Sequence, residues 1–165
     1  MTQWLTRSQE ERALLNPSFL SLLFWHAATG HMAEGNVGLP FSTSFLVLPI
    51  VLHGETRESL PKIVTTSLPV WLNDNQLVRA RVAERARTLV PYTKEALVFG
   101  GVRCLLKLSA EAVSAERSWK LKVTGAFVGS SDEVRSCAKR AHFLGRWFAR
   151  SGSPATVMAL LGVRP

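Results

Sequence analysis

The chain has 165 residues, of which 47% are hydrophobic and 19% are charged, with a formal net charge of +8. This composition excludes a disordered chain, which needs low hydrophobicity and a high charge fraction. Residues 1–78 carry four Lys/Arg and six Asp/Glu, whereas residues 79–165 carry sixteen Lys/Arg and six Asp/Glu. The basic C-terminal half predicts an anionic partner, with nucleic acid as the first candidate. A contact with an acidic protein and a merely solvated surface are the alternatives.

The sequence favours a cytoplasmic protein without a membrane segment. Its longest apolar run, Phe45–Leu52, is far shorter than the ~20 residues of a membrane span, and the N-terminus lacks a signal-peptide pattern. Two cysteines, Cys104 and Cys137, are too few for a disulfide framework, so we expect reduced thiols.

Local signals predict several helices in the N-terminal half. Ser8 begins a capping box that predicts a short helix, and Asn16-Pro17 predicts the start of a helix over residues 17–32. Residues 39–54 predict a buried helix kinked at Pro49, although their β-branched residues also allow a strand. Short helices are expected after Thr56 and after Ser67.

The next segment has the element order of a winged helix. Residues 75–90 predict a helix that Pro91 ends, and residues 93–99 predict a second helix. Apolar residues then alternate over 104–108 and 119–123, which predicts a basic β-hairpin. Together these elements form a winged-helix-like helix–turn–helix plus β-hairpin.

Two helices are expected in the C-terminal region. A long one runs from a cap at Ser130 or Ser131 to Arg150, and a last one covers residues 154–161. The predicted fold class is mainly α (α+β) in a single domain, 1–165. Its expected parts are a helical part (1–73), a winged-helix-like part (74–128) and C-terminal helices (130–162).

The sequence contains no pattern that predicts catalysis, a metal or another cofactor. It has only two aspartates, and its cysteines are isolated from other metal ligands. Phosphate-binding glycine loops and a hydrolase Gly-x-Ser-x-Gly motif do not occur. We therefore expect a binding protein and not an enzyme.

Two sets of residues are candidate contacts. Basic side chains that could bind DNA or another anionic partner are expected on one helix and on the hairpin: Arg79, Arg81, Arg85, Arg87, Arg103, Lys107, Arg117, Lys120 and Lys122. A solvated helix face and a lysine-protected sheet edge are the alternatives. The candidate protein-docking residues are Arg146, Trp147 and Arg150, with ordinary core packing of the tryptophan as the alternative.

Three sequence blocks carry a resemblance to a known family. They cover residues 39–61, residues 83–97, and residues 143–157 together with Gly162-Val163-Arg164-Pro165. In this order they resemble the middle component of bacterial three-component ABC (ABC-3C) systems, a broad class that includes the small subunit of Lamassu-type antiphage defence.

This resemblance implies a non-catalytic adaptor in antiviral defence. Its expected partners are an SMC-like ABC ATPase, expected as a dimer, and an effector subunit, expected to be a nuclease, with DNA backbone contact as an addition. A free-standing winged-helix DNA-binding regulator is the competing hypothesis.

Overall fold

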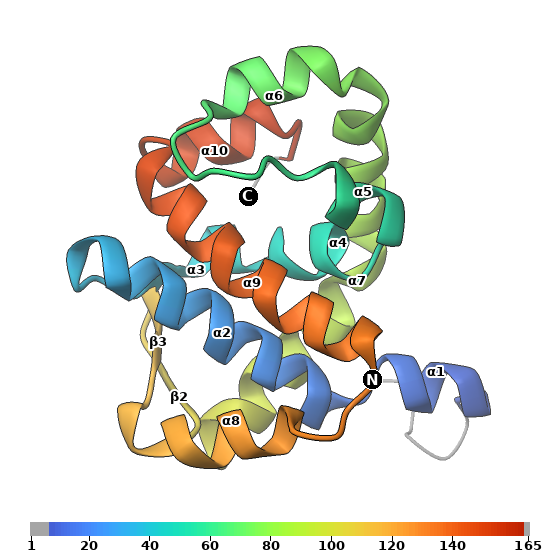
Figure 1. The fold of residues 1–165 in the computed structure, drawn as a ribbon, viewed down its shortest axis with the longest axis vertical. Coiled ribbons are helices and arrows are strands. Elements are labelled where there is room, and N and C mark those ends of the chain that lie inside the picture. The colour runs from blue at the N-terminus through green and yellow to red at the C-terminus, as the bar shows by residue number, and fades with distance from the viewer. Residues whose placement is uncertain (1–6, 164–165) are drawn as a thin grey trace.

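Helices dominate the computed structural model, which describes residues 7–163 (Figure 1). Residues 1–6 and 164–165 lie outside the described residues; they include most of the N-terminal segment searched for a signal peptide and the end of the third resemblance block. The helices are α1 (Gln9–Leu14), α2 (Pro17–Gly35), α3 (Phe41–Ser44), α4 (Val47–Val51), α5 (Gly54–Ser59), α6 (Leu68–Asp74), α7 (Gln76–Val102), α8 (Lys120–Phe127), α9 (Asp132–Arg150) and α10 (Pro154–Leu160). The strands β1 (Leu39–Pro40), β2 (Leu106–Leu108) and β3 (Ala112–Ala115) and a 3-10 turn, η2 (Arg117–Trp119), complete the described elements. The predicted class, mainly α with a small sheet, is confirmed.

Short polar side chains cap the start of five of the ten α-helices in the described residues. An oxygen of the N-cap residue accepts a hydrogen bond from the backbone N–H two or three positions further on; the residues are Ser8, Asn16, Ser67, Ser131 and Ser153. Each bond satisfies one of the N–H groups that a helix start leaves without a partner. The helix starts predicted at Ser8, Asn16, Ser67 and Ser131 are confirmed.

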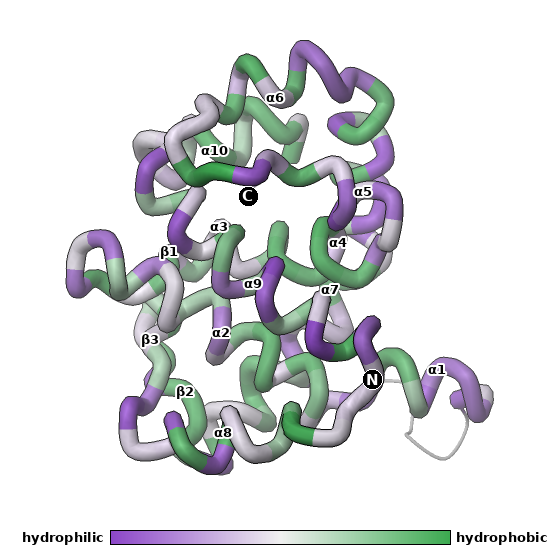
Figure 2. Tube along the Cα trace, in the orientation of Figure 1, coloured by the Kyte–Doolittle hydropathy of each residue, from purple (hydrophilic) through white to green (hydrophobic). Residues whose placement is uncertain are grey.

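Helices α2 and α9 cross in backbone contact at the centre of the molecule (Figure 1). A Cβ at Gly30 of α2 would lie 2.0 Å from the carbonyl oxygen of His142, and a Cβ at Gly145 of α9 would lie 1.9 Å from that of Ala27. Only glycine permits such an approach. Helix α9 is amphipathic: hydrophobic and hydrophilic residues alternate along it, as the colours in Figure 2 show. Its apolar side packs against α2.

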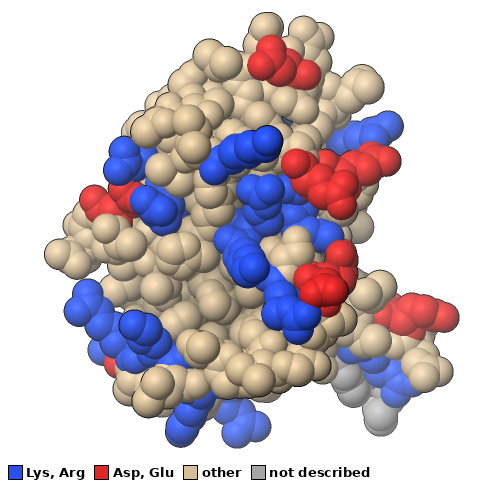
Figure 3. All heavy atoms as spheres, viewed as in Figure 1, with Lys and Arg blue, Asp and Glu red and all other residues tan. Residues whose placement is uncertain are grey.

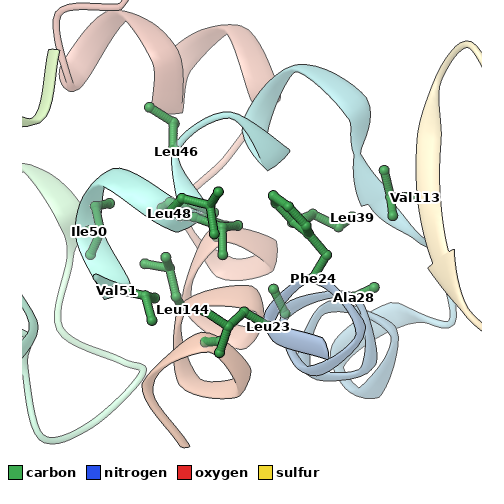
Figure 4. Close-up of a cluster of buried hydrophobic side chains, with 14 of the residues drawn as sticks. Leu23, Phe24, Ala28, Leu39, Leu46, Leu48, Ile50, Val51, Val113 and Leu144 are labelled. Atoms are coloured by element: carbon green, nitrogen blue, oxygen red, sulfur yellow. The ribbon is translucent and has the colours of Figure 1, made fainter. Parts of the chain in front are cut away.

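Residues 39–54 form the centre of the core, but not as one helix. They give β1 and the short helices α3 and α4, and Leu48 and Ile50 of α4 belong to the same buried cluster as Leu23 and Phe24 of α2 and Leu144 of α9 (Figure 4). The helix is interrupted between Ser44 and Val47 and not at Pro49. Pro49 is the third residue of α4, where a backbone N–H has no partner within the helix in any case.

Helix α7 runs without interruption through Pro91, so the predicted helix–turn–helix is wrong. Proline removes the N–H that would bond to the carbonyl of Arg87. Both residues are exposed, so water can reach that carbonyl. Buried side chains on either side, Ala86 before and Ala96 after the proline, keep both halves of the helix against one core.

The sheet has the order β1–β3–β2, and both pairings are antiparallel. The β2–β3 hairpin confirms the first predicted strand. The second strand, predicted over 119–123, is wrong: the chain reverses immediately after Leu108, because the Ser109 hydroxyl accepts hydrogen bonds from the backbone N–H groups of Glu111 and Ala112. Residues 119–123 instead belong to η2 and α8, and Leu121 is 85% exposed.

One connected cluster of buried side chains includes residues from all three predicted parts of the chain. With a continuous α7 and no second long strand, residues 74–128 do not form a winged helix. The hypothesis of a free-standing winged-helix regulator therefore loses its structural basis.

Candidate interaction surfaces

An apolar groove of about 390 Å³ lies between α1, α4, α7 and α9. Its lining is mostly aliphatic or aromatic and consists of Leu14, Leu15, Phe19, Leu48, Pro49, Leu52, Leu89, Val134 and Cys137. Four polar residues complete it: Glu11, His53, Arg85 and Glu133. Leu14 on α1 is 67% exposed, so apolar surface is open to solvent here.

The start of α5 organises the polar end of this groove. The backbone N–H of Thr56 donates to Nδ1 of His53 at 3.3 Å, so the neutral ring carries its proton on Nε2. The Thr56 hydroxyl lies 3.0 Å from the same nitrogen and accepts a hydrogen bond of 2.9 Å from Nη2 of Arg85. Burial, followed by the charge of Arg85, lowers the pKa of His53, so the ring is neutral at pH 7.

Arg57 is buried beside this cluster and joins three elements. It is 3% exposed, and its Nη1 donates to the carbonyl of Val51 at 2.8 Å and to Sγ of Cys137 at 3.4 Å. Its Nη2 pairs with the carboxylate of Glu133. A buried arginine needs such partners, because desolvating an unpaired charge is costly.

In the part of the chain that the structure describes, two of the three arginines around His53 form ion pairs and Arg85 does not. Arg57 pairs with Glu133, and Arg81 pairs with Glu55 at 3.4 Å. Arg85 has no carboxylate within 4.0 Å among residues 7–163, and its Nε is buried without a hydrogen-bond partner. Burial and then the neighbouring Arg81 lower the pKa of Arg85, but the guanidinium remains charged at neutral pH.

The four predicted α7 arginines do not form one patch. Arg81 and Arg85 are one turn apart and face α5, whereas Arg79 and Arg87 lie about half a turn around the helix. Nη2 of Arg79 lies 3.5 Å from the carbonyl of Ala159 in α10, and Arg87 is exposed. Only Arg85 lines the apolar groove.

The predicted hairpin cations lie on or at the end of four different elements: α7, β2, η2 and α8. Lys107 is on β2 and pairs with Glu116 at 2.8 Å, and Arg103 is the C-cap of α7. Arg117 and Lys120 line a cleft of about 340 Å³ against the second half of α2, together with Trp25, Thr29, Met32, Ala33, Asn36 and Ala115. Nζ of Lys122 lies 4.8 Å from the centre of the Trp119 ring.

The predicted docking group separates into a core residue and two paired arginines. Trp147 is fully buried, its Nε1 donates to the carbonyl of Thr66 at 2.6 Å, and its ring meets that of Trp71 edge-on. The prediction of Trp147 as a protein-docking residue is therefore wrong, because its side chain belongs to the buried face of α9. Arg146 and Arg150 both pair with Glu34, at 2.6 and 2.7 Å, and lower its pKa.

A basic area on α9 was missed by the sequence prediction. Lys and Arg side chains gather over the middle of the face shown in Figure 3, with Asp and Glu beside them. Arg135, Lys139 and Arg140 line a shallow hollow there, and Arg140 donates to the carbonyl of Pro61, next to Lys62. The signal available in the sequence was the set of cations on α9 that lie off its apolar stripe.

Two further findings concern the described part of the chain. Residues 7–163 contain no group of three or more His, Cys, Asp or Glu side chains placed to hold a metal ion. None of the helices over this range combines the length and the hydropathy that crossing a membrane requires.

The comparison with family models assigns the chain to a three-component ABC system. It matches the ABC-three component (ABC-3C) system Middle Component 3 over residues 4–165, and the chain belongs to this family. This confirms the middle-component prediction and implies protein partners. No curated protein and no solved structure matches the chain.

Proposed function

We propose that this chain is a cytoplasmic, non-catalytic adaptor that bridges an SMC-like ABC ATPase and an effector nuclease in a Lamassu-type antiphage system. The observation that carries the proposal is the family match, which covers residues 4–165 and names a middle component. A middle component works with at least two other chains, so its function depends on surfaces that bind them.

The placement of two hollows supports simultaneous binding of two partners. The apolar groove includes Phe19, near the start of α2, whereas the cleft beside Arg117 and Lys120 includes Met32, near its end. Thirteen residues of α-helix span about 20 Å. Two chains could therefore bind at opposite ends of α2 without overlapping.

DNA contact is the secondary part of the proposal. Lys139 and Arg140 have no carboxylate within ion-pair distance among the described residues, and Lys62 is exposed near Arg140. Such cations can bind the phosphates of the DNA backbone. Phosphate contacts carry no sequence information, which is read from the base edges in the grooves of DNA. We expect this contact to be independent of sequence and to weaken steeply with salt.

Native mass spectrometry of the chain co-expressed with the products of its neighbouring genes tests the adaptor function. The expected result is one assembly that contains this chain, an ABC ATPase and an effector. Recovery of this chain alone at micromolar concentration, with the ATPase and the effector in separate species, would refute the proposal.

A further inference from the structure

The apolar groove has the form of a site for one helix. Its lining residues come from helices or from the residues that flank them, and neither β1, β2 nor β3 contributes a strand edge. The walls therefore offer no row of free backbone N–H and C=O groups to which an extended segment could pair. A segment buried on this floor has to satisfy its own backbone hydrogen bonds, and an α-helix does so.

The polar end of the groove holds one cation, Arg85, that forms no ion pair with any carboxylate of residues 7–163. Glu133 and Glu55 are already engaged by Arg57 and Arg81, and within residues 7–163 the one hydrogen-bond partner of the Arg85 side chain is the Thr56 hydroxyl. Its guanidinium has five N–H donors, of which one is used, and its Nε is buried. A carboxylate is the group that matches two of those donors at once.

Glu11, the other carboxylate that lines the groove, is also engaged within the chain. Glu11 on α1 lies 3.7 Å from Nε of Arg7 and accepts a hydrogen bond from the Tyr92 hydroxyl. Nη2 of Arg7 pairs with Glu95 at 2.6 Å, and the Arg7 guanidinium lies 5.1 Å from the centre of the Tyr92 ring. These contacts attach α1 to α7 and hold its exposed Leu14 at the edge of the groove, where an occupant would cover it.

We propose that this groove binds an amphipathic helix of a partner protein, with the apolar face of that helix on the leucine-rich floor and one Asp or Glu carboxylate on Arg85. The inference rests on the proposed adaptor function, because the helix belongs to the ATPase or the effector encoded beside this chain. It is distinct from the DNA contact, which we assign to α9.

Two groove variants, each with one matched control variant, test the site. Arg85→Glu and Leu14→Asp change the groove, whereas Arg87→Glu and Leu77→Asp make the same chemical changes on exposed residues outside its lining. Loss of a hydrogen-bonded charge pair weakens binding by about tenfold or more. We expect each groove variant to bind one partner with at least about tenfold lower affinity, measured by titration of the purified chains. Each control should change the affinity by less than about twofold.

A charge exchange identifies the carboxylate. Asp and Glu residues on amphipathic helices of the affected partner are changed singly to Lys, and each variant is titrated against Arg85→Glu. Recovery of at least half of the lost affinity by one of them is expected. Thermal melting of Arg85→Glu and Leu14→Asp checks that both fold, which we expect because Leu14 is exposed and Arg85 lies at the groove edge.

The outcomes separate this inference from the adaptor function. If the unmodified chain binds its partners and the groove variants bind as tightly as the controls, the groove inference is wrong and the adaptor function stands. If the unmodified chain binds neither neighbour, the adaptor function fails and the groove inference fails with it. A homodimer that Arg85→Glu dissociates would assign the groove to a second copy of this chain and overturn the inference.

Discussion

Gly145→Ala tests the backbone contact between α2 and α9. The added methyl group would lie 1.9 Å from the carbonyl oxygen of Ala27, which is about 1.5 Å inside the 3.4 Å at which ordinary contact begins. It would also lie 2.9 Å from the backbone nitrogen of His31. Because these are backbone atoms, rotation of a side chain cannot relieve the overlap, and the two helices have to separate.

Separating the helices lowers the stability of the fold, and the higher helix propensity of alanine offsets only part of that loss. Overfilling a packed core costs about 1–3 kcal/mol or more, whereas alanine in place of glycine favours a helix by up to ~1 kcal/mol. We expect Gly145→Ala to lower the free energy of unfolding by about 2 kcal/mol. For a chain of this size the melting temperature should fall by about 4–8 °C.

Chemical denaturation followed by circular dichroism measures this change, with Gly125→Ala as the matched control. A Cβ at Gly125 of α8 meets no atom within 4 Å, so the control should equal the unmodified chain or be slightly more stable. Equal denaturation midpoints for Gly145→Ala and the unmodified chain would refute the close crossing of α2 and α9.

Three other predictions concern buried groups. Arg57→Ala should lower the free energy of unfolding by about 2–4 kcal/mol, because it removes the buried guanidinium hydrogen bond to the Val51 carbonyl and leaves that carbonyl with the weaker thiol donor of Cys137 at 3.7 Å. Arg87→Ala, on an exposed side chain, should change it by less than ~0.5 kcal/mol; similar denaturation midpoints for the two variants would contradict this. Burial, and then the nearby His142, lowers the pKa of His26 to about 4, so the unfolded chain takes up a proton that the folded chain does not. Stability should therefore be retained above pH 6.5 and decrease as the pH falls toward 4, by at most ~3 kcal/mol from this group, and a flat free energy of unfolding over that range would contradict it. A thiol reagent should modify exposed Cys104 in the folded chain and reach buried Cys137 only after unfolding, as mass spectrometry can count; two modified thiols in the folded chain would be the contrary result.

Local signals were predictable because they act over three or four residues. Ser8, Asn16 and Ser131 each accept a backbone hydrogen bond from the first turn of the helix that follows, so their spacing was sufficient. The turn at Ser109 uses equally local bonds. It was missed because the alternation of Trp119, Leu121 and Val123 gave a stronger strand pattern than the turn residues did.

Pro91 and Trp147 show why other predictions failed. The local preference of a proline is to end a helix, but α7 is held on the core by buried residues on both sides of it. The exposure of a tryptophan depends on how far the buried stripe of its helix extends, and α9 is covered by α2 and by the segment around Thr66.

By itself, the sequence determined the mainly helical class, the helix starts at Ser8, Asn16, Ser67 and Ser131, the excess of cations in the second half and the middle-component family. The tertiary structure decided which cations remain without a carboxylate partner. Arg57 meets Glu133 76 positions away and Arg146 meets Glu34 112 positions away, whereas the Arg85 side chain, in the part of the chain that the structure describes, donates to the Thr56 hydroxyl and to no carboxylate. Such pairings are set by the packing of whole helices, which no local pattern encodes, and they leave Arg85 as the charged residue of the groove lining that has no ion pair among residues 7–163.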